Sequence, residues 1–141
     1  MMDARSESFF PHVHPDLVKV LRASAQDPQP FLVVYGLRTL AAEQEAVNTG
    51  HSHTLHSRHL PNAEGLSYAV DVAALIAGKV SFAPGHEAII FGGIAAQMKK
   101  AALTLSVPIQ WGGDPIGAWI PGVVSTFRDW GHFQLPWAEY P

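Results

Sequence analysis

Two side chains near the end of the chain have the types and the spacing needed for metal-assisted hydrolysis. Asp129 precedes His132 by three residues, so the histidine can bind a metal ion while the carboxylate accepts a proton from the water that the metal activates. Further upstream, His59 and Asp71 offer two more ligands of the kinds that zinc prefers. Three protein ligands leave the fourth position of zinc open, which a catalytic site needs and a structural site lacks.

The local pattern by itself leaves simpler explanations open. Asp71 lies in an apolar run between Val70 and Val72, where a carboxylate is costly to bury unless it is paired or binds a metal. If both valines face the core, Asp71 faces the opposite way, into a cleft or into solvent. A metal ligand and a surface carboxylate are equally compatible with this pattern, and an aspartate three residues before a histidine is common by chance.

The other six histidines have simpler explanations than catalysis. Those ahead of the first expected helix fit capping or surface roles, one fits the start of a later helix, and three lie in a polar loop where they are expected to be solvated. That loop group also allows loose metal binding, substrate contacts or a second metal ion. These six residues are His12, His14, His86, His51, His53 and His56.

The composition excludes several classes of protein. The chain has 141 residues, 48% of them hydrophobic, which suits one domain of ordinary size. It contains no cysteine, which excludes disulfides, thiolate zinc fingers and a cysteine nucleophile. The formal net charge of −3 argues against nucleic acid as a partner. We find no secretory signal and no apolar run of the ~20 residues that span a membrane. We therefore expect a single domain over residues 1–141.

Hydrophobic spacing and turn residues predict a mixture of helices and strands. Apolar residues at helical spacing, with Ile90, Ile94, Met98, Ala101 and Leu105 as the buried face of the longest helix, alternate with short β-branched runs. The order lacks regular β-α-β alternation, so we expect an α+β fold with a small, largely antiparallel sheet packed with helices. The expected helices are Pro15–Ala25, Leu40–Asn48 after a Thr39 cap, and Glu87–Leu105; the expected strands are Phe31–Tyr35, Tyr68–Ile76, Val80–Phe82, Pro108–Trp111 and one within Phe127–Leu135.

Several motifs, taken in order, resemble the zinc D,D-/L,D-peptidase family. This family includes D-alanyl-D-alanine carboxypeptidases and phage endolysins of the L-alanyl-D-glutamate endopeptidase type. The resemblance runs from about His14 to the end of the chain. The motifs are His14-Pro15-Asp16-Leu17-Val18, Gly36-Leu37-Arg38-Thr39, Ser57-x-His59, Ala69-x-Asp71, Trp111-Gly112-Gly113-Asp114, Asp129-x-x-His132-Phe133-x-Leu135 and Pro136-Trp137-Ala138-Glu139-Tyr140-Pro141.

The resemblance implies a hedgehog/D-Ala-D-Ala peptidase-like fold and a role for each motif residue. It implies that His59, Asp71 and His132 bind Zn²⁺ and that Asp129 is the catalytic base. Arg38 matches the family's arginine, which steadies the substrate carbonyl or the oxyanion. Such a fixed cation helps the transition state more than the ground state.

Two further residues receive roles next to the metal. Ser57 is expected to contact the substrate or to support a ligand from behind. Trp130, with Trp111, is expected to line the cleft and contact substrate, although core packing or anchoring of a loop explains either tryptophan as well.

The chain departs from the family pattern in two loops. The segment between His59 and Asp71 is about five residues longer than usual, with the insertion around residues 61–65. The loop at residues 115–126 is also longer than in many members. Both insertions flank the expected cleft, so they leave substrate specificity open, and they could lengthen strands or cover the site.

These observations predict a zinc-dependent peptidoglycan peptidase. The preferred form is a phage-type endolysin that hydrolyses the L-alanyl-D-glutamate bond of the stem peptide. It would be made in the host cytoplasm, act as a monomer without a separate wall-binding domain, and reach the wall after release by a separate pore former. The alternatives are a D-alanyl-D-alanine carboxypeptidase, a non-catalytic zinc-binding module on the same fold, and a hydrolase with two metal ions.

Overall fold

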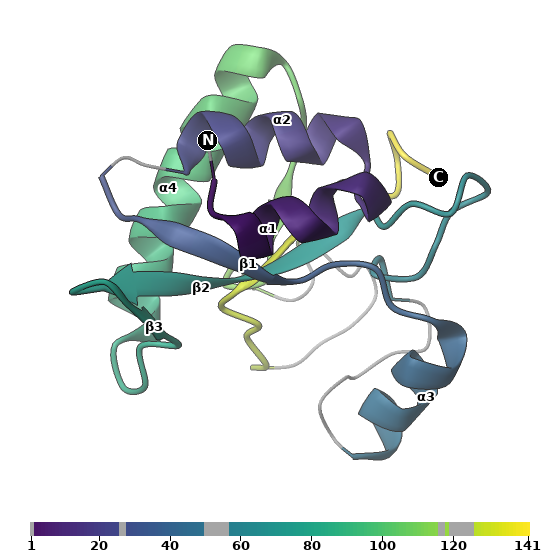
Figure 1. Ribbon diagram of the computed structural model, residues 1–141, viewed down its shortest axis with the longest axis horizontal. Helices are drawn as coiled ribbons and strands as arrows, with labels where there is room; N and C mark the ends of the chain where they lie inside the picture. The colour runs from purple at the N-terminus through teal and green to yellow at the C-terminus, as the bar shows by residue number, and fades with distance from the viewer. Residues whose placement is uncertain (1, 26–27, 50–56, 116–117, 119–125) are drawn as a thin grey trace.

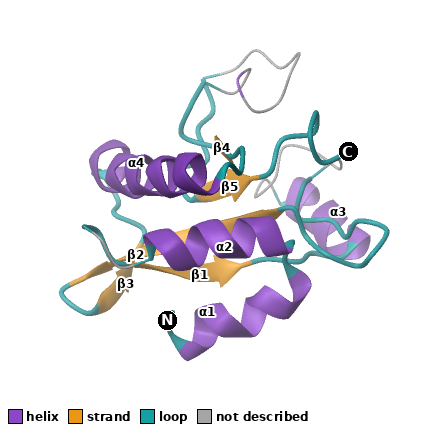
Figure 2. Ribbon diagram, turned by 90° about the horizontal axis from the view of Figure 1, so that it is seen from above, coloured by secondary structure: helices purple, strands orange, loops and turns teal. Residues whose placement is uncertain are grey.

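The strands form one sheet, as Figures 1 and 2 show. The structure, a computed structural model, describes residues 2–25, 28–49, 57–115, 118 and 126–141. The strands lie in the order β1-β2-β5-β4, β3 pairs with the end of β2, and every strand pair is antiparallel. The predicted α+β class with an antiparallel sheet is therefore confirmed. The strands are β1 (Phe31–Tyr35), β2 (Ala69–Ile76), β3 (Lys79–Ser81), β4 (Gln110–Trp111) and β5 (His132–Gln134).

Helices cover the sheet unevenly. In Figure 1, α1 and α2 lie on one side of β1 and β2, whereas α3 projects on the other side, apart from the other helices. The bounds of α3 and α4 agree with those expected, and the Thr39 hydroxyl caps α3 by accepting from Ala42 N at 3.1 Å. The helices are α1 (Ala4–Phe9), a 3₁₀ turn (Phe10–His12), α2 (Pro15–Ser24), α3 (Leu40–Asn48) and α4 (Glu87–Leu105).

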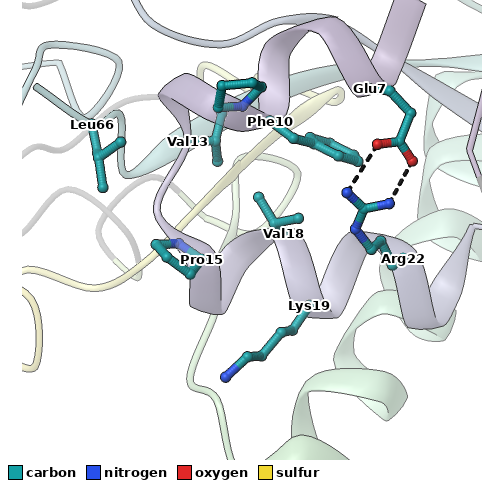
Figure 3. A pocket seen from close by; sticks show the side chains of 9 residues that line it. Glu7, Phe10, Val13, Pro15, Val18, Lys19, Arg22 and Leu66 are labelled. Atoms are coloured by element: carbon teal, nitrogen blue, oxygen red, sulfur yellow. Dashed lines mark hydrogen bonds and ion pairs between the residues drawn. The ribbon is translucent and has the colours of Figure 1, made fainter. Parts of the chain in front are cut away.

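The helix α1 was not predicted from the sequence. This helix has only six residues, too few for a hydrophobic period to show. Its buried Ser6 hydroxyl accepts a hydrogen bond of 2.8 Å from Val33 N on β1, so α1 covers the outer edge of the sheet. Glu7 pairs with both terminal nitrogens of Arg22 on α2, beside a cavity of about 550 Å³ between the two helices (Figure 3). Tertiary contacts therefore hold α1 in place.

The core lies between α2, α4 and the sheet. Fully buried side chains include Leu17 and Leu21 of α2, Ile94 and Met98 of α4, and Phe133 of β5. Burying a side chain of this size contributes roughly 1.5–3 kcal/mol.

The expected buried face of α4 is partly wrong. Ile94 and Met98 are buried as predicted, but Leu105 is 40% exposed. The last buried residue of the helix is Ala102, and the chain leaves the helix at Ser106 in a left-handed conformation with φ of 57°. Leu105 consequently lies beyond the packed part of the helix. By length and composition alone α4 could cross a membrane, a test that core helices also pass, and about a third of its apolar window is buried inside the protein.

The inserted segment after His59 packs against the N-terminal part of the chain. Ser67 N donates to His12 O at 2.8 Å, and His14 N donates to Ser67 O at 2.9 Å. The Asn62 side chain closes the turn by accepting from two backbone N–H groups within the segment. The inserted segment is therefore anchored by hydrogen bonds to the N-terminal part of the chain. The second expected insertion, and His51, His53 and His56, lie largely outside the described residues.

Candidate metal centre

Three potential ligands that are far apart in the sequence meet at one end of the sheet. Asp71 on β2 and His132 on β5 are direct partners in the antiparallel ladder, which places their side chains next to each other. His59 Nε2 and His132 Nδ1 each lie 3.3 Å from Asp71 Oδ1. The three ligand atoms lie within 4.8 Å of one another. The structure thus brings together all three predicted ligands.

Each imidazole is oriented by a hydrogen bond at its other nitrogen. His59 Nδ1 lies 2.7 Å from Gly36 O, and His132 Nε2 lies 2.7 Å from Gln134 Oε1. These oxygens only accept, so the ring nitrogens facing them carry the protons. The nitrogens that face Asp71, His59 Nε2 and His132 Nδ1, are then the ones whose lone pairs can bind a metal ion. This arrangement is the usual support behind metal-binding histidines.

Gln134 is a supporting residue that the sequence interpretation missed. Its side-chain nitrogen donates to Gln110 Oε1 at 2.9 Å, which fixes its oxygen toward His132. A signal was present, because residues two apart on a strand share a face and His132 and Gln134 have this spacing.

The residue before His59 belongs to a cluster that we call the C-terminal clamp. Its centre is Arg58, which is 3% exposed and whose guanidinium lies 4.0 Å from the ring centroids of both Tyr68 and Trp137. Burial lowers the pKa of Arg58 to about 10, against an opposing effect of Tyr68. The guanidinium donates to the carbonyl oxygens of Leu135, Pro136 and Tyr140.

Ser57 supports His59 from the chain itself. Its hydroxyl accepts a hydrogen bond of 3.1 Å from His59 N. Ser57 lines a cavity of about 310 Å³ beside the C-terminal clamp, whereas Asp71 and Asp129 line a different one. The contact fits the supporting role considered for Ser57, and its substrate contact stays a prediction.

The glycines of the Trp111 motif place the expected base. Gly112 N donates to His132 O, and Asp129 N donates to Gly112 O, both at 2.8 Å. A Cβ on Gly112 would lie 2.2 Å from Asp129 O, and one on Gly113 would lie 2.1 Å from the Trp111 ring. Only glycine allows such close approaches. Asp129 is thereby fixed beside His132, with Oδ2 3.9 Å from Nδ1.

The charges of the centre favour a cation beside Asp71. Burial alone would raise the pKa of Asp71, but His59 and His132 hold that pKa well below its usual value. Burial opposes protonation of His132, yet Asp71 and Asp129 outweigh it and raise the pKa of His132 to about 9. Burial and then repulsion by Asp71 raise the pKa of Asp129, against the effects of both histidines and Arg38.

A cavity of about 530 Å³ opens onto this centre. Arg38, Asp71, Asp129 and Trp130 all line it, and 43% of the Asp129 side chain is exposed. The Arg38 guanidinium lies 4.6 Å from the Tyr35 ring centroid, and Arg38 N donates to His59 O at 2.8 Å. A substrate in this cavity can therefore meet Asp71, the expected base Asp129 and the cation of Arg38 together.

Trp130 takes part in both packing and the cavity wall. Its ring lies 5.9 Å from the Trp111 ring, centroid to centroid, and its carbonyl accepts a hydrogen bond from Trp111 Nε1 at 2.8 Å. Substrate contact by Trp130 stays a prediction.

The donor set fits a catalytic zinc ion. Two imidazoles, which bind a metal in their neutral form, and one carboxylate that faces the cavity form a set of three protein ligands that zinc hydrolases use. The structure supports a metal site of His59, Asp71 and His132. The choice of zinc rests on this chemistry.

Comparison with known proteins agrees with the geometry. The sequence profile of the phage L-alanyl-D-glutamate peptidases matches residues 1–135. The chain belongs to this family. This membership confirms the predicted class of enzyme, a peptidase of the L-alanyl-D-glutamate type, and so favours it over the carboxypeptidase alternative.

A solved structure extends the agreement to the whole chain. The crystal structure of the Serratia marcescens L-Ala D-Glu endopeptidase ChiX matches with a TM-score of 0.79 and 38% sequence identity, covering 99% of this chain and 92% of that one. A search of curated proteins found no match. The family resemblance and the α+β fold expected from the sequence are both confirmed.

Proposed function

We propose that this protein is a zinc-dependent endopeptidase that cleaves the L-alanyl-D-glutamate bond in the stem peptides of bacterial peptidoglycan. The observation that carries the proposal is the meeting of His59, Asp71 and His132 within 4.8 Å, beside Asp129, in a member of this family. The name of ChiX, an L-Ala D-Glu endopeptidase, supports the same bond.

The metal would be held by His59 Nε2, His132 Nδ1 and the Asp71 carboxylate. When bound there, zinc polarises a carbonyl oxygen and lowers the pKa of water. The second hydrogen bonds to Gly36 and Gln134 keep each imidazole in the tautomer that can donate its lone pair.

Asp129 is the proposed general base. Its carboxylate lies on the cavity wall beside His132, so it can accept a proton from the attacking water. The same group then passes the proton to the amine of D-glutamate when the peptide bond breaks. A positioned proton carrier of this kind contributes roughly 10²- to 10⁴-fold in rate.

Arg38 is proposed to stabilise the oxyanion that forms from the L-alanyl carbonyl. Its contact with the Tyr35 ring and its backbone bond to His59 hold this cation in place before the reaction. A donor that is already oriented is worth more in the transition state than in the ground state. Trp130, which lines the same cavity, is proposed to contact the substrate there, and Ser57 is proposed to contact it from the second cavity beside the C-terminal clamp.

The phage family also suggests where the enzyme works. We propose that it acts as a monomer on the cell wall, after a separate pore former releases it from the host cytoplasm. Ultracentrifugation would test the monomer, and lysis of cells with and without a co-expressed pore former would test the release.

The decisive experiment is mass spectrometry of peptidoglycan fragments after digestion by the zinc-loaded protein. We expect new peptides that begin with D-glutamate, together with freed L-alanine carboxyl ends. The Asp129→Ala variant should bind zinc but release neither. Loss of only a terminal D-alanine would identify a carboxypeptidase, and no cleavage by a zinc-loaded protein would favour a binding module.

A further inference from the structure

The cavity in front of the metal centre has a surplus of positive charge once a divalent ion is bound. Its lining includes three arginines and three carboxylates, which balance one another. The imidazoles of His59 and His132 are neutral when they bind a metal. The ion's two charges are then uncompensated by the lining, so the cavity suits an anionic substrate. The charged lining residues are Arg5, Arg38, Arg128, Asp71, Glu87 and Asp129.

Arg128 is the cavity arginine best placed to bind an anion beside the base. Its side chain is half-buried, and its Nη1 donates to the main-chain oxygens of Thr126 and Phe127 at 3.4 and 3.2 Å. Within the described residues, no carboxylate forms an ion pair with it at 4.0 Å or less. A half-buried guanidinium without a carboxylate favours an acidic ligand, because a charged acceptor strengthens its hydrogen bonds.

The other two arginines of the cavity differ from Arg128. Arg38 lies against the Tyr35 ring and is already assigned to the oxyanion. Arg5 belongs to α1 and is exposed, so water weakens its attraction for an anion. Arg128 combines partial burial with a position in the chain next to Asp129.

The chemistry of the bond supplies the anion. A glutamyl residue has two carboxyl groups, and only one of them continues the peptide chain. The other is free, and it lies a few covalent bonds from the amine that leaves when the L-alanyl bond breaks. Asp129 gives its proton to that amine, and the Cα atoms of residues 128 and 129 are about 3.8 Å apart. A long arginine side chain on the same cavity wall can therefore reach this carboxylate.

We propose that Arg128 binds the free carboxylate of the D-glutamyl residue and makes the enzyme prefer stem peptides in which this group is an acid over those in which it is an amide. This inference rests on the proposed function. The primary amide has the same shape but no charge, so it loses the charge-assisted hydrogen bonds and places an N–H donor against the guanidinium. Arg128 is thus a specificity-determining residue.

The test uses two synthetic peptides that differ only in this group, acid or primary amide, with the zinc-loaded full chain. We expect kcat/KM of the unchanged protein to favour the acid by roughly 10- to 100-fold. Arg128→Gln should reduce this preference toward unity, mainly through slower cleavage of the acid. Arg128→Lys, which keeps the charge, should retain part of it. Lys100→Gln is the matched control, because Lys100 is exposed on α4 and does not line the cavity.

Equilibrium binding of the released D-glutamyl peptide, measured by calorimetry, compares the acid with the amide again without turnover. Equal cleavage of the acid and the amide by the unchanged protein would overturn the inference and leave the proposed function intact. An Arg128→Gln protein that keeps both its fold and the full preference for the acid would also overturn it. Failure of the unchanged protein to cleave either peptide would overturn the proposed function, and this inference with it.

Discussion

The two histidines of the candidate metal centre are held by different kinds of structure. His132 lies on β5, where the ladder with β2 sets it opposite Asp71. His59 lies in a turn outside the sheet, although it is as deeply buried. Its position depends on the Ser57 hydroxyl, the carbonyl of Gly36 and the neighbouring C-terminal clamp.

This difference teaches what each ligand needs. A ligand on a strand takes its position from backbone hydrogen bonds that almost any sequence can make. A ligand on a loop needs contacts with specific side chains to hold its position. We therefore expect changes around His59 to cost folding stability and metal affinity together, and changes around His132 to cost mainly metal affinity.

Asp71→Ala removes the carboxylate that both histidines face, and it therefore affects the two differently supported ligands equally. We expect a loss of zinc and a fall in kcat/KM of at least about 10³-fold, because a first ligand and its charge are lost. Metal analysis and peptide cleavage measure both effects. Glu139→Ala, at an exposed carboxylate of the C-terminal segment, should change neither. Full zinc content in Asp71→Ala would show that Asp71 is not a ligand.

Arg58→Met tests the support of His59. Three carbonyl oxygens would lose their charged donor, so we expect the free energy of unfolding to fall by about 2–4 kcal/mol. Zinc affinity should fall as well, since the clamp adjoins His59. Denaturant unfolding and a competitive zinc titration measure the two quantities.

Arg22→Met is the control for Arg58→Met. This arginine also lies near an aromatic ring, Phe10, and pairs with Glu7, but it is partly exposed and far from the centre in the chain. We expect a loss of no more than about 1 kcal/mol and unchanged zinc affinity. Equal effects of the two substitutions would contradict a special role for the C-terminal clamp.

Removal of the metal should make stability depend on pH through His132. In the metal-free protein its pKa is raised to about 9, above the unfolded value of about 6.5. Its stabilising contribution is therefore complete below pH 6.5 and is lost as the pH rises through 9, by up to about 3 kcal/mol. Thermal unfolding in a chelator between these pH values measures this. A midpoint that rises over the range would contradict the assignment, and zinc should abolish the trend by displacing the proton.

Gln134→Leu tests the support of His132 and is expected to cost less folding stability than Arg58→Met. The imidazole would lose the acceptor at Nε2, so we expect zinc affinity to fall by roughly 10- to 100-fold. The backbone ladder remains, so the strand should stay in place. Unfolding measured without zinc should show a smaller loss than in Arg58→Met, and a larger loss would reverse the contrast between the two histidines.

Much of the fold could be predicted because its longer elements carry their own signals. The bounds of α4 follow from a long apolar period, and those of α3 from a cap at Thr39 and nearby breakers. The short α1 gave no such signal, because its stability comes from Ser6 and Glu7 reaching other elements. Leu105 was misplaced because periodicity cannot show where a packed face ends.

The residues of the candidate site could also be predicted in large part, because their chemistry is visible in the sequence. The chemistry of His59, Asp71, Asp129 and His132 is a property of side-chain types that the chain itself displays. The role of Arg58 could not be predicted in the same way, although it lies between two motif residues. The sequence does not distinguish an arginine on the surface from one that is stacked between two rings.

The sequence by itself determined which donor atoms exist, and with them the metal chemistry and the family. Only the tertiary structure decided which nitrogen of each imidazole is left for a metal, because Gly36 reaches His59 from a distant segment and Gln110 on β4 turns the Gln134 amide toward His132. It also decided that Asp71 faces the cavity and not open solvent. The hydrogen bonds between His59 and Gly36 and between Gln134 and Gln110 join distant segments, so the tautomer of each imidazole is selected only when the chain has folded.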